Sequence, residues 1–167
     1  VINQDYDNVE YIIVDGGSTD STLDIIKKYK NQIDYWISEP DDGLYYAMDK
    51  GIKLGNGLYC GNINADDFYN NNILKDIVEN FIDNNIDFLH GNMFIITNTT
   101  KKYIKRSIGN QGNINKGMTI NHPTVFLKRE TYFNIGGYNL NYRVCSDFEL
   151  MVKLLVLQKE GKKINKF

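Results

Sequence analysis

Three short polar segments of the sequence carry carboxylates at spacings that could do chemistry. The first is the run Asp-Gly-Gly-Ser-Thr-Asp at residues 15–20, which follows an apolar segment and precedes an amphipathic one. Its glycines would let the backbone approach a ligand closely, and the start of the following helix would favour an anion. Asp15 could accept hydrogen bonds from a base edge or a ribose. An ordinary capped turn between a strand and a helix explains the same residues equally well.

The second segment, residues 64–67, places Asp66 and Asp67 directly behind another apolar run. Adjacent carboxylates at the end of a strand can bind a hard divalent cation through their oxygens. Such a cation could bridge a diphosphate and neutralise a departing nucleotide. The two residues could instead cap the next helix, but Asn72 lies nearer to it, and burying two unpartnered carboxylates would be costly. We therefore favour a metal site here.

The third segment opens the last predicted helix, with Asp147 and Glu149 in its first turn. Asp147 could cap the helix, and Glu149 could complement the helix dipole. Alternatively, Asp147 could point into a cleft and take a proton from an acceptor hydroxyl. Spacing alone leaves both interpretations open.

The two histidines and two cysteines are weaker candidates. His90 follows an apolar run and is expected to be structural, whereas His122 lies in a loop and could contact a metal or a phosphate. Cys60 and Cys145 have no metal-ligand spacing and no implied base, so we expect both to be packing residues. Two cysteines are too few for a disulfide scaffold, which points to a reducing cytoplasm.

Alternating strands and helices must position these segments. Strands are predicted at residues 9–14, 33–37, 58–63, 86–89, 93–96 and 124–127, and residues 101–108 could form a hairpin with the strand before them. Helices are predicted at residues 21–29, 44–54, 73–82, 129–135 and 147–157. This alternation predicts an α/β sandwich with a mostly parallel sheet. Ligands of such sheets bind beyond the carboxyl ends of the strands, where Asp15 and Asp66 both fall.

Composition limits the classes of protein that fit. The 167 residues suit one domain, and 42% hydrophobic with 24% charged residues is an ordinary globular mixture. The net charge of −2 argues against a general nucleic-acid binder. No run approaches the ~18 apolar residues that a membrane span needs. The basic carboxyl end is either a solvated helix end or a contact for an anionic membrane, through Lys159, Lys162, Lys163 and Lys166.

Taken in order, these segments resemble glycosyltransferase family 2, whose members are inverting nucleotide-sugar transferases of the GT-A fold. Residues 11–20 are similar to the family's opening nucleotide-binding motif, residues 38–51 to its second block, and residues 61–67 to its Asp-x-Asp metal region. Residues 121–126, 136–138 and 146–150 look like its acceptor-side blocks.

The resemblance implies one GT-A domain over residues 1–167, built as a three-layer sandwich. The nucleotide-binding part would cover about residues 1–70 and the acceptor-binding part about residues 71–167. The implied activity is transfer of a sugar, with inversion, from a nucleotide-diphosphate donor to a saccharide or lipid-linked acceptor. Such an enzyme would work in the cytoplasm, at times against the inner face of the membrane, in bacterial surface-polysaccharide synthesis.

The resemblance also implies roles for individual residues. Asp147 would be the catalytic base that deprotonates the acceptor hydroxyl. A bound Mn²⁺ or Mg²⁺ would be held by Asp66, with Asp67 and His122 beside it. The nucleotide sugar would be bound by Asp15, Gly17, Ser18, Asp41, Asp42, Lys50, Asn64 and Asp66.

The sequence departs from the family pattern in several places. Asn64 replaces the first aspartate of Asp-x-Asp, which keeps an oxygen but removes a charge. Tyr46 stands where the family often has aspartate, and Asp49 where it often has asparagine. The family also begins with a strand that carries part of the nucleobase pocket, followed by a helix. Residues 1–4 look like the end of that helix, so we expect a domain truncated at its amino end.

Two other functions remain as alternatives. A nucleotidyltransferase that makes sugar nucleotides has a related α/β architecture, but it normally carries a glycine-rich loop with arginine and lysine after its first strand. That region is not contained in this chain. A nucleotide-binding remnant that has lost turnover would retain donor binding without forming product.

Overall fold

The computed structural model describes residues 1–96, 103–106, 117, 120–159 and 164–166. Its first half contains β1 (Ile12–Asp15), α1 (Thr22–Lys28), the 3-10 turn η1 (Lys30–Gln32), β2 (Tyr35–Ser38), α2 (Leu44–Leu54), β3 (Tyr59–Gly61) and α3 (Ile73–Asn84). The second half contains β4 (Phe88–His90), β5 (Met93–Ile96), β6 (Tyr103–Arg106), the 3-10 turn η3 (His122–Thr124), β7 (Phe126–Lys128), α4 (Arg129–Asn134), α5 (Ser146–Lys159) and β8 (Ile164–Lys166).

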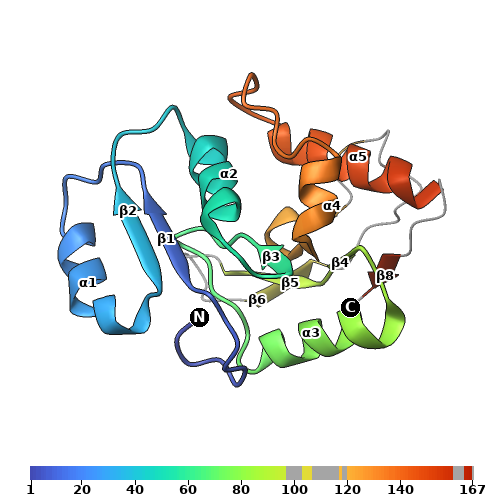
Figure 1. Ribbon diagram of the computed structural model, residues 1–167, viewed down its shortest axis with the longest axis horizontal. Coiled ribbons are helices and arrows are strands. Elements are labelled where there is room, and N and C mark those ends of the chain that lie inside the picture. The colour runs from blue at the N-terminus through green and yellow to red at the C-terminus, as the bar shows by residue number, and fades with distance from the viewer. Residues whose placement is uncertain (97–102, 107–116, 118–119, 160–163, 167) are drawn as a thin grey trace.

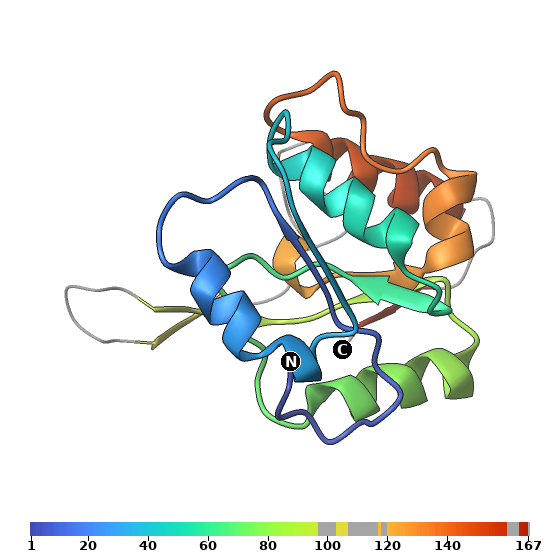
Figure 2. The same cartoon turned by 60° about the vertical axis from the view of Figure 1, so that its left-hand side comes forward.

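The elements form three layers (Figures 1 and 2). Helices α2, α4 and α5 cover one face of the strands, and α3 covers the opposite face. Helix α1 lies outside β2, at the end of the molecule away from α5. The predicted α/β sandwich is therefore confirmed, and every predicted helix exists with its ends within two residues of the expected positions.

The strands pair in both directions. β1 and β2 are parallel, with Ile12 opposite Tyr35 and Asp15 opposite Ser38. In the sheet of order β3-β7-β4-β8, β7 is antiparallel to both of its neighbours, and β8 is parallel to β4. β5 and β6 form the expected antiparallel hairpin. The strands of the described residues thus form separate sheets with both parallel and antiparallel pairs. The sequence could not predict these directions, because a short apolar run has the same pattern whichever way its neighbour runs.

Two apolar clusters hold the layers together. The larger packs α2, α4 and α5 on one face of the sheet, with Met48, Leu127, Tyr132 and Leu154 among its members. The smaller packs α3 on the other face, where Phe81 and Leu89 are each 1% exposed. Burial of this kind is worth about 25 cal/mol for each Å² of apolar surface.

The start of α3 is capped differently from the prediction. Asn72 precedes the helix in a left-handed conformation, with φ of 61°, and its side chain makes no capping hydrogen bond. Gln4 takes that role, because its Oε1 accepts from the backbone nitrogens of Ile73 at 3.0 Å and Leu74 at 3.3 Å. Residues 1–4, predicted as the end of a helix, form one turn in which the Gln4 nitrogen donates to the Val1 carbonyl.

The carboxyl end also differs from the prediction. Lys166 belongs to β8, a strand that the basic composition of this end concealed. Lys159 ends α5, while Lys162 and Lys163 lie outside the described residues. In the described part of the chain, none of the helices combines the length and apolar character of a bilayer span.

Candidate active site

Asp15 organises the loop that follows β1. Its Oδ2 accepts from the backbone nitrogens of Gly17 at 3.2 Å and Ser18 at 3.0 Å, and from the Ser38 hydroxyl at 2.6 Å. Its Oδ1 accepts from the Ser18 hydroxyl at 2.5 Å. The hydrogen bonds from the Ser18 and Ser38 hydroxyls hold the pKa of Asp15 below its ordinary value. The carboxylate is therefore ionised at neutral pH, and Oδ1 keeps capacity for one further donor.

The segment that resembles the second family block, residues 38–51, packs against this loop. The Glu39 nitrogen donates to the Asp15 carbonyl at 3.0 Å. Gly16 lies so close to Asp41 that a Cβ there would meet the Asp41 Oδ2 at 2.8 Å, so only glycine fits without a shift. Asp41 accepts from the Gly43 nitrogen at 2.9 Å, which places its carboxylate at the start of α2.

Two further residues were predicted to bind the nucleotide sugar, and both lie near the start of α2 or within it. Asp42 is exposed in the turn before α2. Lys50 projects from α2 and forms an ion pair with Glu39 at 2.5 Å. The structure therefore brings Asp15, Gly17, Ser18 and Asp41 together directly, and it ties Lys50 to them through Glu39.

The loop after β3 presents oxygen atoms. Asn64 is half-buried; its Nδ2 donates to the Asp67 Oδ2 at 3.2 Å, while its Oδ1 is buried without a hydrogen-bond partner. Asp66 and Asp67 are exposed. No three Asp, Glu, His or Cys side chains among the described residues converge as a ready metal site. A buried amide oxygen without a hydrogen-bond partner, beside exposed carboxylates, is nevertheless the kind of oxygen ligand set that a hard cation binds.

Asp147 meets a tyrosine that the sequence did not single out. The Tyr45 hydroxyl, from the first turn of α2, donates to the Asp147 Oδ1 at 2.7 Å. Tyr45 is 9% exposed, and burial together with the Asp147 carboxylate raises the pKa of Tyr45. The phenol therefore stays protonated and keeps Asp147 at the junction of α2 and α5. α5 begins at Ser146, so Asp147 lies inside the first turn and not at the cap position, and this bond fixes its half-buried carboxylate.

A second polar chain runs beside that pair. The His122 Nε2 lies 2.8 Å from the Tyr138 hydroxyl, which also accepts from the Asn62 Nδ2 at 3.1 Å. Burial lowers the pKa of His122, and the nearby charge of Asp147 opposes that shift. The Tyr138 hydroxyl thus links His122 to Asn62, which lies two residues before Asn64 of the predicted metal loop, and His122 is also close enough to Asp147 to interact with its charge.

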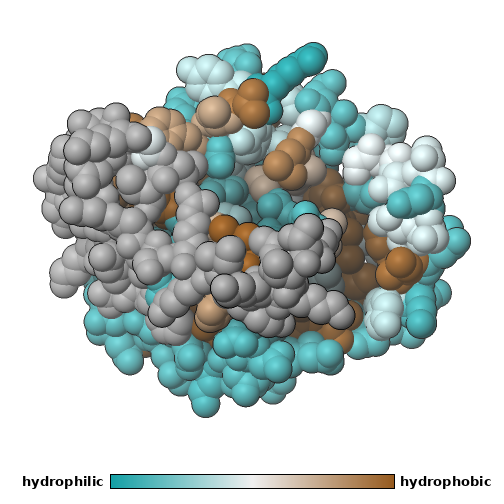
Figure 3. Space-filling model, turned by 180° about the vertical axis from the view of Figure 1, so that it is seen from behind, coloured by the Kyte–Doolittle hydropathy of each residue, from teal (hydrophilic) through white to brown (hydrophobic). Residues whose placement is uncertain are grey.

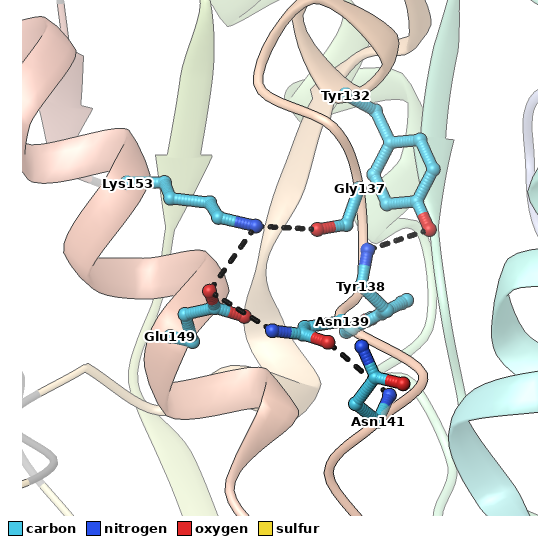
Figure 4. Close-up of polar contacts among 7 residues, drawn as sticks. All are labelled: Tyr132, Gly137, Tyr138, Asn139, Asn141, Glu149 and Lys153. Carbon is cyan, nitrogen blue, oxygen red and sulfur yellow. Dashed lines mark hydrogen bonds and ion pairs between the residues drawn. The ribbon is translucent and has the colours of Figure 1, made fainter.

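A glycine turn in the predicted acceptor-side segment, residues 136–138, is held by contacts with α4 and α5 (Figure 4). Lys153 of α5 donates to the Gly137 carbonyl at 3.2 Å and pairs with Glu149 at 3.5 Å, while the Tyr138 nitrogen donates to the Tyr132 hydroxyl at 3.1 Å. Gly137 has φ of 59°, and a Cβ there would lie 2.6 Å from the Tyr132 ring. The glycine is therefore required for the ring to pass.

Asp49 and Cys60 have structural roles, whereas Cys145 does not pack. Asp49 is buried; it accepts from the Tyr132 hydroxyl at 2.8 Å and pairs with Lys53 at 2.7 Å. Cys60 packs against the core, and burial raises the pKa of its thiol to about 12. Cys145 was predicted to pack, but it is exposed in a loop with φ of 71°, so that prediction was wrong.

Comparison with known proteins identifies the family. The model of the family described as "Glycosyl transferase family 2" matches residues 1–145. The chain belongs to glycosyl transferase family 2. The predicted resemblance is thereby confirmed.

This family 2 chain has relatives in several bacteria. It is 28% identical over 162 residues to the "PGL/p-HBAD biosynthesis glycosyltransferase" of Mycobacterium bovis, matching 92% of the chain and 60% of that protein. It is 29% identical over 144 residues to an uncharacterised glycosyltransferase of Haemophilus influenzae, matching 78% of the chain and 54% of that protein. The family 2 chain thus spans somewhat more than half the length of these relatives.

Solved structures show the same fold as this family 2 chain. S. aureus TarS 1-349 in complex with UDP-GlcNAc superposes with a TM-score of 0.77 and 20% identity, over 99% of this chain and 49% of that one. A mannosyltransferase from Pyrobaculum calidifontis, in complex with GDP-Man and Mn²⁺, gives a TM-score of 0.67 and 14% identity, over 99% and 48%. The predicted GT-A fold is confirmed.

Sequence reasoning named the carboxylates of the candidate site but did not name the polar groups that contact this site in the structure. Tyr45, Asn62 and Tyr138 each donate or accept within the network around Asp147 and His122. The only sign of these three residues in the sequence was their position, since each lies in a segment that resembles a family block. An aromatic residue on an apolar helix face gives no sign of which polar group its hydroxyl meets.

Proposed function

We propose that the chain is the catalytic part of a metal-dependent, inverting glycosyltransferase that uses a nucleotide-diphosphate sugar. The observation that carries this proposal is the 2.7 Å hydrogen bond between Tyr45 and Asp147. It joins the helix that begins behind the predicted donor loops to the helix that carries the predicted base. Family membership and neighbours solved with UDP-GlcNAc and with GDP-Man support a nucleotide-sugar donor.

The donor would be bound by the loops after β1 and β2. Asp15, Gly17 and Ser18 would contact the nucleoside, with Asp41, Asp42 and Lys50 beside it. The start of α2 would favour the negative diphosphate, since backbone N–H groups at a helix amino end attract anions. Support comes from the packing of these loops around Asp15 and Asp41.

A divalent cation, Mn²⁺ or Mg²⁺, would be held by Asp66 and Asn64, with Asp67 and His122 as further candidate ligands. When bound, it would neutralise charge on the departing diphosphate. The buried, unpartnered Oδ1 of Asn64 supports this set. The His122 Nε2 already contacts the Tyr138 hydroxyl, so coordination through that nitrogen would replace this contact.

Asp147 would act as the general base. Its carboxylate would accept the proton of the acceptor hydroxyl as that oxygen bonds to the anomeric carbon and the bond from this carbon to the diphosphate oxygen breaks. Attack from the face opposite the leaving group inverts the anomeric centre. Tyr45 occupies the Oδ1 of Asp147 and leaves Oδ2 for the acceptor.

The acceptor is proposed to be a saccharide or a lipid-linked saccharide of bacterial surface-polysaccharide synthesis. A relative named for PGL/p-HBAD biosynthesis supports a biosynthetic transferase of this general kind. The proposal extends to peripheral contact with the inner face of the membrane through the basic carboxyl end, whose composition supports it.

Nucleotide release with Mn²⁺ and a panel of nucleotide sugars tests the proposal. We expect turnover of one donor, a loss of about 10²-fold or more in Asp147→Asn, and loss of metal-dependent nucleotide binding in Asp66→Ala. Asp24→Asn, on exposed α1, is the matched control. NMR of the product's anomeric proton checks inversion.

Three results would count against the proposal. Absence of turnover with every donor, together with unchanged nucleotide binding in Asp66→Ala, would remove the enzyme assignment. Nucleotide binding without any product would favour a non-catalytic remnant. Release of pyrophosphate from a nucleoside triphosphate would favour a nucleotidyltransferase.

A further inference from the structure

The hydroxyl of Tyr138 lies between two polar side chains that come from distant parts of the chain. It is 2.8 Å from the Nε2 of His122, in η3, and 3.1 Å from the Nδ2 of Asn62, in the loop after β3. Tyr138 is 5% exposed, and its ring packs against the rings of Tyr45 and Tyr132. The phenol is therefore held in place, with little water available to bond its one proton.

These three groups fix the direction of both hydrogen bonds. The Asn62 amide nitrogen can only donate, so the Tyr138 oxygen accepts from it. Burial raises the pKa of Tyr138, so the phenol keeps its proton at neutral pH. Among the described residues that proton has one partner left, the Nε2 of His122, and a buried donor without a partner is costly. The phenol therefore donates to the imidazole.

The His122 ring must then carry its own proton on the other nitrogen. A ring nitrogen that accepts a hydrogen bond has no proton, and a neutral imidazole has only one proton to place. Burial lowers the pKa of His122, which favours the neutral ring at neutral pH. The chain from Asn62 through Tyr138 thus selects the tautomer of His122 that has its proton on Nδ1.

The Nδ1 side of His122 belongs to the region around Asp147. The charge of the Asp147 carboxylate opposes the lowering of the His122 pKa, so the two side chains are near each other. His122 is half-buried, and no described residue forms a hydrogen bond with its Nδ1. Tyr45 occupies only the Oδ1 of Asp147. The pair therefore offers one donor, Nδ1–H, and one acceptor, Oδ2, which are the two partners that a hydroxyl group needs.

The other end of this chain of hydrogen bonds reaches the largest cavity of the described structure. Asn62 is part of the wall of this cavity, which lies between β1 and β3 and has a volume of about 1190 Å³. Seen from behind, the molecule shows apolar side chains gathered in a recess on the right of the view (Figure 3). Tyr138, His122 and Asp147 do not line the cavity. A ligand in the cavity would contact Asn62 and not His122, so the Nδ1–H group serves the separate region around Asp147.

We propose that His122 donates from Nδ1 to the acceptor hydroxyl whose proton Asp147 accepts, and that Tyr138 and Asn62 are positioning residues that hold His122 in the required tautomer. The acceptor oxygen would accept from His122 through one lone pair and attack the anomeric carbon through the other, while its proton passes to Asp147. Neither nitrogen of the ring then has a free lone pair for a cation, so His122 would not be a metal ligand. The inference rests on the proposed function, because it needs an acceptor substrate at Asp147.

Nitrogen-15 NMR of the histidine side chains tests the tautomer without any substrate. The chain has two histidines, and the signals that vanish in His122→Asn belong to His122. We expect the chemical shift of an unprotonated nitrogen for Nε2 and that of a protonated nitrogen for Nδ1. Nε2 protonated in the parent chain would overturn the proposal.

A variant of Asn62 should reverse the tautomer. In Asn62→Asp the new carboxylate accepts the phenol proton, so the Tyr138 oxygen must accept from Nε2–H of His122. Asn31→Asp, at an exposed position of η1, adds the same charge and should leave the tautomer unchanged. Circular dichroism checks that both variants fold, and the spectrum of the parent chain decides the matter if Asn62→Asp does not. An unchanged tautomer in folded Asn62→Asp would overturn the proposal.

Two amide variants of His122 test the contact with the acceptor. His122→Asn keeps an N–H donor near the position of Nδ1, whereas His122→Gln keeps one near the position of Nε2. We expect kcat/KM for the acceptor to fall roughly tenfold in His122→Gln, the effect of one lost hydrogen bond, and less in His122→Asn. Equal falls in both variants, or no fall, would overturn the proposed contact. Absence of turnover with every donor would instead defeat the proposed function, and the NMR result distinguishes the two failures because it needs no substrate.

The dependence of turnover on Mn²⁺ separates this role of His122 from metal binding. The Mn²⁺ concentration that gives half-maximal turnover should be the same in His122→Asn as in the parent chain. An increase of roughly tenfold or more, the usual effect of disturbing a metal site, would show that His122 binds the cation and would overturn the proposal.

Discussion

Tyr45 and Asp147 are 102 residues apart in the sequence and meet through one hydrogen bond. Tyr45 also packs on Tyr138, with ring centroids 5.6 Å apart, so the phenol is fixed from two sides. Besides the Tyr45 hydroxyl, Tyr138 and His122 interact electrostatically with Asp147, and burial lowers the pKa of His122. Tyr45 is accordingly a positioning residue for the proposed base.

Tyr45→Phe tests this role, because it removes the hydroxyl and keeps the ring. We expect turnover to fall roughly tenfold, the effect of about 1.4 kcal/mol in the barrier, while nucleotide-sugar binding measured by calorimetry stays unchanged. Tyr35→Phe, at the exposed first position of β2, is the control. If nucleotide-sugar binding in Tyr45→Phe falls as much as turnover does, the role of Tyr45 is merely structural.

Ser38→Ala tests the network around Asp15. The lowered pKa of Asp15 means that its charge stabilises the fold above the unfolded value of about 3.9 and that this contribution disappears as the pH falls through the folded value. Loss of the Ser38 hydroxyl should lower the free energy of unfolding by about 1–2 kcal/mol at neutral pH. In urea denaturation the difference should shrink below about pH 3.9. Ser21→Ala, whose hydroxyl makes no capping bond, is the control; a difference independent of pH would contradict the explanation.

At the scale of elements, the turn between α4 and α5 depends on two adjacent glycines of unequal surroundings. Gly136 has φ of 80° and open space where a Cβ would lie, whereas Gly137 has φ of 59° and the Tyr132 ring in that place. Gly136→Ala should therefore cost about 1 kcal/mol of stability through backbone strain alone. Gly137→Ala should cost at least about 1 kcal/mol more, because the ring must also move. Equal losses in chemical denaturation would show that the ring does not matter.

The amino end of the chain supports α3 through Gln4. Its side chain satisfies two backbone donors of the first turn of the helix and donates to the Asn70 carbonyl at 2.9 Å. Gln4→Ala should lower the free energy of unfolding by about 0.5–2 kcal/mol, the usual range for a lost cap. Gln32→Ala, at an exposed position in η1, should have little effect. Thermal unfolding of the two variants checks this, and equal midpoints would exclude the cap.

Which elements the sequence could predict follows from the range of their interactions. α2 and β5 begin and end at the predicted residues, because apolar periodicity and a glycine before α2 are local signals. The cap of α3 could not be predicted, since Gln4 lies about 70 residues away along the chain. β8 was missed because lysines surround it and its partner β4 is distant in sequence.

The candidate site divides in the same way. Asp15, Asp66 and Asp147 could be predicted, because each is a carboxylate at the end of an apolar strand or the start of a helix. The Tyr45–Asp147 bond and the His122–Tyr138–Asn62 chain could not, because they form only when α2, η3 and α5 pack together. Sequence pattern indicated which groups carry charge, and tertiary packing decided which of them meet.

At the scale of the whole molecule, two strand edges without ladder partners in the described structure lie beside an apolar recess. Edges of this kind are templates for pairing with other chains, which natural proteins blunt with charges, bulges or coverings. The net charge of −2 gives copies of the chain little mutual repulsion. We expect the average molar mass measured by light scattering to rise with protein concentration at neutral pH. The rise should be steeper as the pH falls toward the value at which the net charge is zero.

Two variants that add the same charge separate the edges from general electrostatics. Leu58→Glu places a carboxylate at the wall of the recess, and Val144→Glu places one at a similarly exposed position elsewhere, so each variant raises the net negative charge by one. Association should decrease more in Leu58→Glu, and equal decreases in both variants would assign the effect to net charge alone. If the variant beside the strand edges decreases association more, the arrangement of β1 and β3, and not surface composition alone, sets the concentration up to which this chain remains monomeric.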